Sequence, residues 1–242
     1  MAGRGRLRIG TSGWQYDDWR GSFYPSGLPK KEWFKYYAQH FDTVEVNNTF
    51  YRLPSESTFD SWRNQAPPQF CYTLKFSRYG TQMKKLKEPC ATIGTFIERA
   101  LRLREFLGPV LVQLPPRWKR DVPRLAAFLD AAPSGVRWAI EFRDESWLHD
   151  DVFEVLHNHG AALVIHDLIE NHPKEVTAGW VYLRFHGVDY SHDYSAQALS
   201  NVSAWLGDCL ERGLDVYAYF NNDYHGYAVY NARDLRRCVE NG

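Results

Sequence analysis

Charged side chains stand at alternate positions near the ends of several apolar segments of the chain. Four of these side chains could move protons: Glu45, Glu141, Asp167 and His186. Carboxylates and imidazoles are the groups that most often serve as general acids and bases. We therefore predict these four as the catalytic residues, with Glu141 and His186 as the leading acid and base.

Further polar side chains occupy matching positions and could bind a substrate. Lysine and arginine would hold a phosphate or carboxylate group, and amide, aromatic and carboxylate groups would orient the rest. The predicted substrate-binding residues are Trp14, Asn47, Lys75, Gln113, Arg143, Arg184, Tyr219, Asn221, Asn222 and Asp223. The last three end an alternating segment, "VYAYFNND", where a strand pattern changes abruptly to polar residues.

A divalent metal ion is a less favoured use of the same groups. Its ligands would be Glu141, Asp167 and His186, since oxygen-rich sets with one histidine suit Mg²⁺ or Mn²⁺. Arg143 and Arg184 would stand close to the ion and repel it. We therefore expect that no cofactor is required.

Eight segments have the pattern of β-strands, and helical segments separate most of them. The predicted strands are 7–14, 43–50, 71–77, 109–115, 137–143, 162–167, 181–187 and 215–223. The predicted helices are 29–41, 81–106 with a break at Pro89, 121–132, 150–160, 195–213 and 227–241. Residues 168–179, after the sixth strand, are too short and broken for a full helix.

This alternation predicts a (β/α)₈ TIM barrel. A doubly wound open sheet is the alternative, but no GxGxxG motif follows the first strand. Because no linker-like composition shift divides the chain, we predict one domain over residues 1–242.

In a barrel, one side of each strand packs against helices and the other side fills the interior. The apolar residues of the fifth strand, such as Trp138, are assigned to the helices, which turns Glu141 and Arg143 inward. The same rule turns Arg184 and His186 inward in the seventh strand. The inward polar residues gather at the carboxyl ends of the strands, where barrel enzymes place their active sites.

Aromatic residues are frequent in the segments that follow the strands, and we expect aromatic-rich loops over this carboxyl-terminal face. Such rings suit sugars or nucleobases, although packing of the long loops would explain about half of them. Two basic runs, 84–87 ("KKLK") and 117–120 ("RWKR"), could touch phosphates, but a solvated surface is the favoured explanation.

The composition narrows the partners and the location. The chain has 29 basic and 29 acidic residues, so its net charge does not favour nucleic acid or an anionic membrane. Its four cysteines are far apart, and no segment resembles a signal peptide or a membrane span. We expect a cytoplasmic protein without a membrane partner. The oligomeric state is not indicated.

Six motifs in chain order resemble the YecE-like family, catalogued as domain of unknown function 72. They are "IGTSGWQYDDWRGSFYP", "FDTVEVNNTFYRLPS", "VLVQLPPRW", "AIEFRDESW", "YLRFHG" and "YFNNDYHGYAVYNA". The resemblance runs from Ile9 to about Leu235 and implies a TIM barrel, but no settled reaction. Gln82 stands where relatives have the histidine of a Thr-His pair, so we assign it no role.

Three functional hypotheses follow. The favoured one is an enzyme of hydrolase, lyase or isomerase type that acts on a phosphorylated or sugar-like small molecule by acid/base chemistry, with lysine and arginine binding the anion. The second is a nucleic-acid-binding or endonuclease-like barrel, which rests on the aromatic loops and basic runs. The third is a non-catalytic ligand-binding protein, in which Lys75, Arg143 and Arg184 only pair with Glu45, Glu141 and Asp167.

Overall fold

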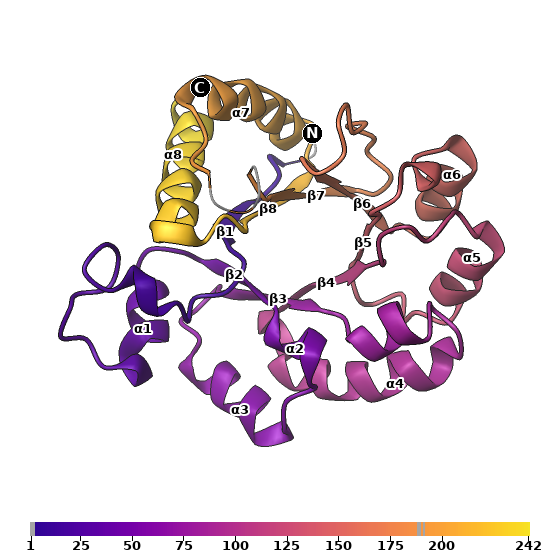
Figure 1. Ribbon diagram of the computed structural model, residues 1–242, viewed down its shortest axis with the longest axis horizontal. Coiled ribbons are helices and arrows are strands. Elements are labelled where there is room, and N and C mark those ends of the chain that lie inside the picture. The colour runs from indigo at the N-terminus through magenta and orange to yellow at the C-terminus, as the bar shows by residue number, and fades with distance from the viewer. Residues whose placement is uncertain (1–2, 188–189, 191) are drawn as a thin grey trace. The chain divides into compact units, whose positions relative to one another are not determined.

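The computed structural model describes residues 3–187, 190 and 192–242. All eight predicted strands are present (Figure 1). They are β1 (Leu7–Thr11), β2 (Thr43–Val46), β3 (Cys71–Lys75), β4 (Leu107–Gln113), β5 (Trp138–Glu141), β6 (Ala162–His166), β7 (Trp180–Phe185) and β8 (Asp215–Phe220). Their order in the sheet, β1-β8-β7-β6-β5-β4-β3-β2, is that of a (β/α)₈ barrel, and the TIM-barrel prediction is confirmed.

The helices between these strands differ in length. They are α1 (Trp33–Tyr37), α2 (Asn48–Tyr51), α3 (Glu56–Gln65), α4 (Pro89–Ala100), α5 (Val122–Asp130), α6 (Asp150–Asn158), α7 (Ala196–Glu211) and α8 (Tyr227–Asn241). Residues 167–179 contain no helix, as predicted. None of the helices in the described part of the chain has both the length and the apolar composition needed to cross a membrane.

The structure corrects several boundaries. The second strand ends at Val46, not at Phe50, because α2 begins immediately afterwards. The Thr49 hydroxyl holds this turn by donating to the Val46 carbonyl at 3.0 Å and to the Lys75 carbonyl at 2.7 Å. Helix α3 has no counterpart in the prediction. In the segment 81–106, α4 begins at Pro89, a residue well suited to the first turn of a helix.

Internal contacts divide the chain into two compact units. Unit 1 comprises Met1–Glu45, His166–Leu168 and Gly179–Gly242, and unit 2 comprises Val46–Ile165 and Ile169–Ala178. The single domain expected over residues 1–242 stays a prediction.

In unit 1, parallel pairing of β7, β8 and β1 sets the side-chain directions. Phe185 is paired with Phe220, and the two rings stack with centroids 4.4 Å apart. Tyr182 and Tyr219, of the opposite parity, have ring centroids 5.3 Å apart. Helices α7 and α8 lie side by side (Figure 1). The predicted alternation of inward and helix-facing residues therefore holds in this unit.

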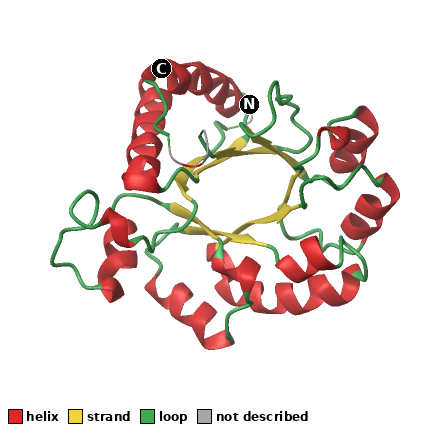
Figure 2. Cartoon of the chain, in the orientation of Figure 1, coloured by secondary structure: helices red, strands yellow, loops and turns green. Residues whose placement is uncertain are grey.

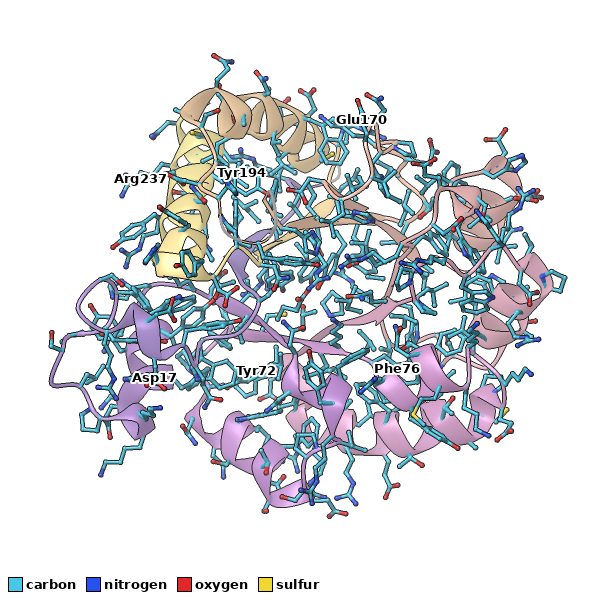
Figure 3. All side chains as sticks on the ribbon, viewed as in Figure 1. Asp17, Tyr72, Phe76, Glu170, Tyr194 and Arg237 are labelled. Atoms are coloured by element: carbon cyan, nitrogen blue, oxygen red, sulfur yellow. The ribbon has the colours of Figure 1, made fainter. Side chains whose placement is uncertain are left out.

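In unit 2, Phe76 marks the side of the strands that packs against helices (Figure 3). Its ring centroid lies 5.0 Å from that of Phe96 on α4, 5.7 Å from that of Phe128 on α5 and 6.2 Å from that of Trp138 on β5. Figure 2 shows α4 and α5 outside the strands of this unit. The assignment of Trp138 to the helices is confirmed, so Glu141 and Arg143 have the interior parity.

Candidate functional site

A buried ion pair joins β2 to β7 within unit 1. Arg184 donates from Nη2 to Glu45 Oε1 at 2.7 Å and from Nε to Oε2 at 3.0 Å. Ser12 Oγ adds a bond to Oε1 at 2.7 Å, and the Tyr182 hydroxyl adds one to Oε2 at 2.5 Å. Arg184 and Glu45 have side-chain exposures of 1% and 0%. The two carboxylate oxygens thus each accept two hydrogen bonds, and Glu45 anchors Arg184.

The neighbouring tyrosine supports this anchoring. Burial, together with the Glu45 carboxylate, raises the pKa of Tyr182 well above its ordinary value. Its hydroxyl therefore stays protonated and remains a donor to Glu45. Tyr219, another tyrosine on this side, is also buried, and its hydroxyl lies 2.7 Å from Thr43 Oγ1.

His186 and Asp167 form a second contact at the carboxyl ends of β7 and β6. The carboxylate accepts from the His186 backbone N–H at 3.0 Å and the Gly187 N–H at 3.0 Å, and it also accepts from the Tyr194 hydroxyl. Its Oδ1 lies 3.2 Å from His186 Nδ1. Burial alone would raise the pKa of Asp167, but these hydrogen bonds outweigh burial and lower it to about 2. Asp167 is therefore a carboxylate at neutral pH.

These neighbours fix which nitrogen of His186 carries the proton. The Asp167 carboxylate can only accept, so Nδ1 must donate to it. The other nitrogen, Nε2, lies 3.3 Å from Nη1 of Arg184, which can only donate. The pattern therefore assigns a neutral imidazole with the proton on Nδ1 and a lone pair on Nε2. This is the form that a general base needs.

The imidazole of His186 lies inside the molecule, with 0% of its side chain exposed. The ring of Tyr190 meets it edge-on with centroids 5.4 Å apart, and the ring of His166 does so at 5.9 Å. The imidazole nitrogens of His186 are therefore not accessible to solvent in this structure. Of these two neighbouring rings, that of Tyr190 is 40% exposed, whereas His166 is buried.

The remaining predicted residues of unit 1 have different surroundings. Trp14 is buried, and its ring packs edge-on against Phe34 of α1. The Asn222 amide is also buried and donates to the carbonyl of His192 and to Asn231 Oδ1, both at 2.9 Å. It thereby ties the end of β8 to α8. Asn221 is half-buried, and its backbone N–H donates to the Phe185 carbonyl.

Asp223 is half-buried at the start of the loop after β8. Burial raises the pKa of its carboxyl group, and the charge of Asp18 adds to this effect. The same carboxylates lie close enough to Tyr16 to help burial raise the pKa of its phenol. Asp223 is thus the predicted binding residue whose environment favours the protonated acid.

In unit 2, the carboxyl ends of β4 and β5 bring together three predicted residues. Glu141 is paired with Gln113 in the sheet register and is fully buried. Arg143 donates from Nε to Glu141 Oε1, and its Nη2 lies 3.4 Å from Gln113 Oε1. The Arg143 side chain keeps 15% exposure, so this cation reaches the surface. Gln82 donates to the Gln113 carbonyl at 3.1 Å.

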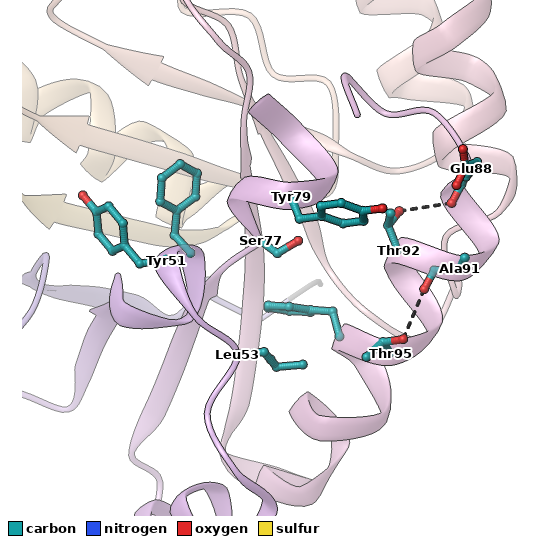
Figure 4. A pocket seen from close by; sticks show the side chains of 10 residues that line it. Tyr51, Leu53, Ser77, Tyr79, Glu88, Ala91, Thr92 and Thr95 are labelled. Atoms are coloured by element: carbon teal, nitrogen blue, oxygen red, sulfur yellow. Dashed lines mark hydrogen bonds between the residues drawn. The ribbon is translucent and has the colours of Figure 1, made fainter. Parts of the chain in front are cut away.

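A pocket of about 420 Å³ opens beside the ends of β2 and β3 in the same unit (Figure 4). Its wall includes Phe50 and Tyr51 from α2, Ser77 after β3, and Tyr79, whose ring projects toward α4. Lys75 Nζ lies 4.5 Å from the centroid of the Phe50 ring, which places this predicted cation next to the wall.

Asn47 precedes α2 and has an unusual side chain. Its Oδ1 is buried and has no hydrogen-bond partner among the described residues. A buried acceptor without a donor is costly, and such atoms are rare in folded proteins. A donor supplied by a ligand would remove this cost.

The structure thus groups Glu45, Asp167, Arg184 and His186 in unit 1, and Gln113, Glu141 and Arg143 in unit 2. Sequence reasoning missed Ser12, Tyr182 and Tyr194 as partners of these groups. Tyr182 had the inward parity and could have been included, whereas Tyr194 reaches Asp167 from a loop that no strand pattern describes. Among the described residues, no group of three or more histidine, cysteine, aspartate or glutamate side chains could hold a metal ion.

A family model and two proteins of known sequence are similar to this chain. A family model described as "Protein of unknown function DUF72" matches residues 8–242. UPF0759 protein YunF of Bacillus subtilis (strain 168) is 23% identical over 272 aligned residues, which cover 97% of this chain and 95% of that protein. UPF0759 protein YecE of Escherichia coli (strain K12) is 32% identical over 108 residues, 44% of this chain and only 40% of that protein's length.

Solved structures agree on the fold. The crystal structure of a DUF72 family protein from Thermotoga maritima MSB8 matches with a TM-score of 0.88 and 29% identity, covering 97% of this chain and 99% of that one. D-Psicose 3-epimerase from Clostridium cellulolyticum H10 matches with a TM-score of 0.58 and 14% identity, over 97% of this chain and 92% of that one. At that identity the epimerase supports the fold alone.

Proposed function

Because this chain belongs to the DUF72 family of proteins of unknown function, its reaction has to be inferred from its site, and we propose that it is an enzyme that transfers protons on a sugar-like or phosphorylated small molecule. The main support for this proposal is that His186 contacts Asp167 through one ring nitrogen and Arg184 through the other. In this arrangement the carboxylate orients the ring, and Nε2 retains the lone pair that accepts a proton.

Arg184 has a defined part in this proposal. It is held by Glu45 through Nε and Nη2, which leaves Nη1 directed toward Nε2 of His186. A substrate hydroxyl that replaces this contact would give its proton to Nε2, and Nη1 would stabilise the resulting oxyanion. Glu45 then acts as a positioning residue for Arg184.

Unit 2, taken by itself, has features that suit the same class of ligand. The aromatic pocket suits the apolar face of a sugar ring, and the buried Oδ1 of Asn47 suits a substrate hydroxyl as its donor. Arg143, partly exposed beside Glu141, and Lys75, beside the pocket wall, suit an anionic group such as a phosphate. Within unit 2, the Glu141 carboxylate is a separate candidate for acid/base work.

The proposal is tested with a substrate found by screening. Sugars, polyols and sugar phosphates would be ranked by the rise in melting temperature that each causes, since ligands that bind the native state stabilise it. Turnover of the compounds that bind would then be compared between the wild type, His186→Ala and Glu141→Gln. We expect His186→Ala to lose roughly 10²- to 10⁴-fold in kcat while the ligand still raises its melting temperature.

The matched control is His157→Ala, at an exposed histidine in α6, which should keep full turnover. Wild-type turnover that survives in both His186→Ala and Glu141→Gln would refute the assignment. If Glu141→Gln lowers only the melting temperature of the free protein, its carboxylate belongs to a structural ion pair.

A further inference from the structure

A second hollow in unit 2 gathers cations around a tryptophan. It has a volume of about 490 Å³, which is in the range of small-molecule sites. Its lining is Met83, Lys84, Lys85, Lys87, Glu88, Trp118, Asp121 and Arg124. The basic run 84–87 and the tryptophan of the run 117–120 thus meet in one place, although more than 30 residues separate them in the chain. We call this hollow the Trp118 pocket.

The two carboxylates of the Trp118 pocket already have partners. Glu88 Oε1 lies 2.9 Å from Lys84 Nζ, and Asp121 caps α5 by accepting from the Arg124 backbone N–H at 3.1 Å. Lys85 and Lys87 are exposed, and neither forms an ion pair with another described residue. The pocket therefore presents an excess of positive charge to an incoming ligand.

The loop that carries these lysines is fixed in shape. Lys85 and Leu86 both have positive φ, of 47° and 61°, and the Leu86 side chain is completely buried. The Leu86 backbone N–H donates to the Gly80 carbonyl at 2.9 Å, and Arg124 Nη1 donates to the Lys85 carbonyl at 3.3 Å. A loop held in this way loses little freedom when a ligand binds.

The ring of Trp118 is held as well. Trp147 meets it edge-on with centroids 5.2 Å apart, and Phe142 stacks on Trp147 at 4.9 Å. The Trp147 indole N–H also donates to the Trp118 carbonyl at 2.5 Å. Lys85 Nζ lies over the Trp118 ring, 5.9 Å from its centroid, so a base that stacks on this face would displace the ammonium toward the phosphate. An aromatic platform therefore stands next to a cation that could contact a phosphate.

From these observations we propose that the Trp118 pocket binds a nucleotide unit, with the base stacked on Trp118 and the phosphate held by Lys85, Lys87 and Arg124. Aromatic stacking combined with phosphate contacts is the way in which proteins bind single-stranded nucleic acid without strong sequence preference. The same chemistry would hold a free nucleotide. This site is separate from the proton-transfer proposal and does not depend on it.

Fluorescence anisotropy of a labelled oligothymidylate of about ten nucleotides provides the test. Affinity would be measured at several salt concentrations, and unlabelled deoxythymidine monophosphate and deoxythymidine would serve as competitors. We expect wild-type binding that weakens steeply with salt, because each phosphate contact releases counterions. Competition by the monophosphate but not by deoxythymidine would identify a free nucleotide as a sufficient ligand, and competition by neither would identify the strand.

Matched variants assign the binding to this pocket. Lys85→Gln with Lys87→Gln should weaken binding by roughly three- to tenfold or more and should reduce the slope of log affinity against log salt by about one. Trp118→Leu should weaken binding by roughly 5- to 100-fold with little change in that slope. The control, Lys119→Gln with Arg120→Gln, removes the same charge from the neighbouring run, where these residues pair with Asp144 and Asp151. It should bind like the wild type.

Two outcomes would overturn the proposal. One is the absence of salt-dependent binding of either phosphorylated probe to the wild type. The other is an equal loss of affinity in the control pair and in the Lys85/Lys87 pair, which would indicate attraction by net charge alone. Melting temperatures of all variants would confirm that each one is folded.

Discussion

At the scale of single residues, the chemistry proposed for unit 1 depends on one chain of contacts. Asp167 fixes the proton of His186 on Nδ1, Arg184 faces Nε2, and Glu45 holds Arg184 through two of its nitrogens. These hydrogen bonds require Asp167 to be ionised and His186 to carry its proton on Nδ1. The sequence showed which residue types were available, but it did not show which of these side chains contact each other.

Asp167 makes stability depend on acidity in a defined window. Its pKa is lowered to about 2 in the folded protein, so the native state favours the carboxylate. The stabilisation is therefore fully present above the ordinary pKa of an aspartate and is lost as the pH falls through about 2. Since the side chain is 32% exposed, we expect a contribution of only about 1 kcal/mol.

Urea unfolding of the wild type and Asp167→Asn between neutral pH and the acid range measures this contribution. The difference in unfolding free energy should shrink as the pH falls below that of ordinary aspartate ionisation. Asp208→Asn, at an exposed carboxylate of α7, removes the same charge without those hydrogen bonds and serves as the control. A wild-type advantage over Asp167→Asn that stays constant down to unfolding would contradict the assigned pKa.

At the scale of elements, the strands were predictable and their ends were not. Strand-like apolar segments identified all eight strands, although both faces of the sixth are apolar, and the broken composition of 168–179 predicted the missing helix. The first three residues of α2 were predicted as the end of a strand, because they show no helical periodicity. Their turn is held by Thr49 bonding to the Lys75 carbonyl, a long-range contact that the local sequence does not reveal.

Gly10 provides a test of strand packing in unit 1. A Cβ atom at this position would lie 2.4 Å from the Thr43 carbonyl oxygen, so β1 and β2 could not keep their spacing. We expect Gly10→Ala to lose at least about 1–3 kcal/mol in urea unfolding. Gly207→Ala, in α7 with nothing near its Cβ position, should instead gain about 0.5–1 kcal/mol. Equal stability of the two variants would show that β1 and β2 do not approach this closely.

At the scale of the whole molecule, the barrel explains why residues distant in sequence come into contact. Parallel strands bring their carboxyl ends to one edge, so parity and strand position predicted that charged side chains would face the interior near these ends, but not which charge would pair with which. The rule does not extend to loops. Tyr194 on Asp167 and Trp118 beside Lys85 are placed by segments whose paths depend on tertiary packing, and neither pairing follows from a strand pattern.

The most direct test of the account is the protonation of His186, measured by nitrogen-15 NMR of its imidazole in the wild type near neutral pH. Assignment would come from the loss of the signal in His186→Ala. We predict a neutral ring with the proton on Nδ1, and a change in this pattern in Asp167→Asn, which replaces the accepting carboxylate. A proton on Nε2, or on both nitrogens, would contradict the proposed general base.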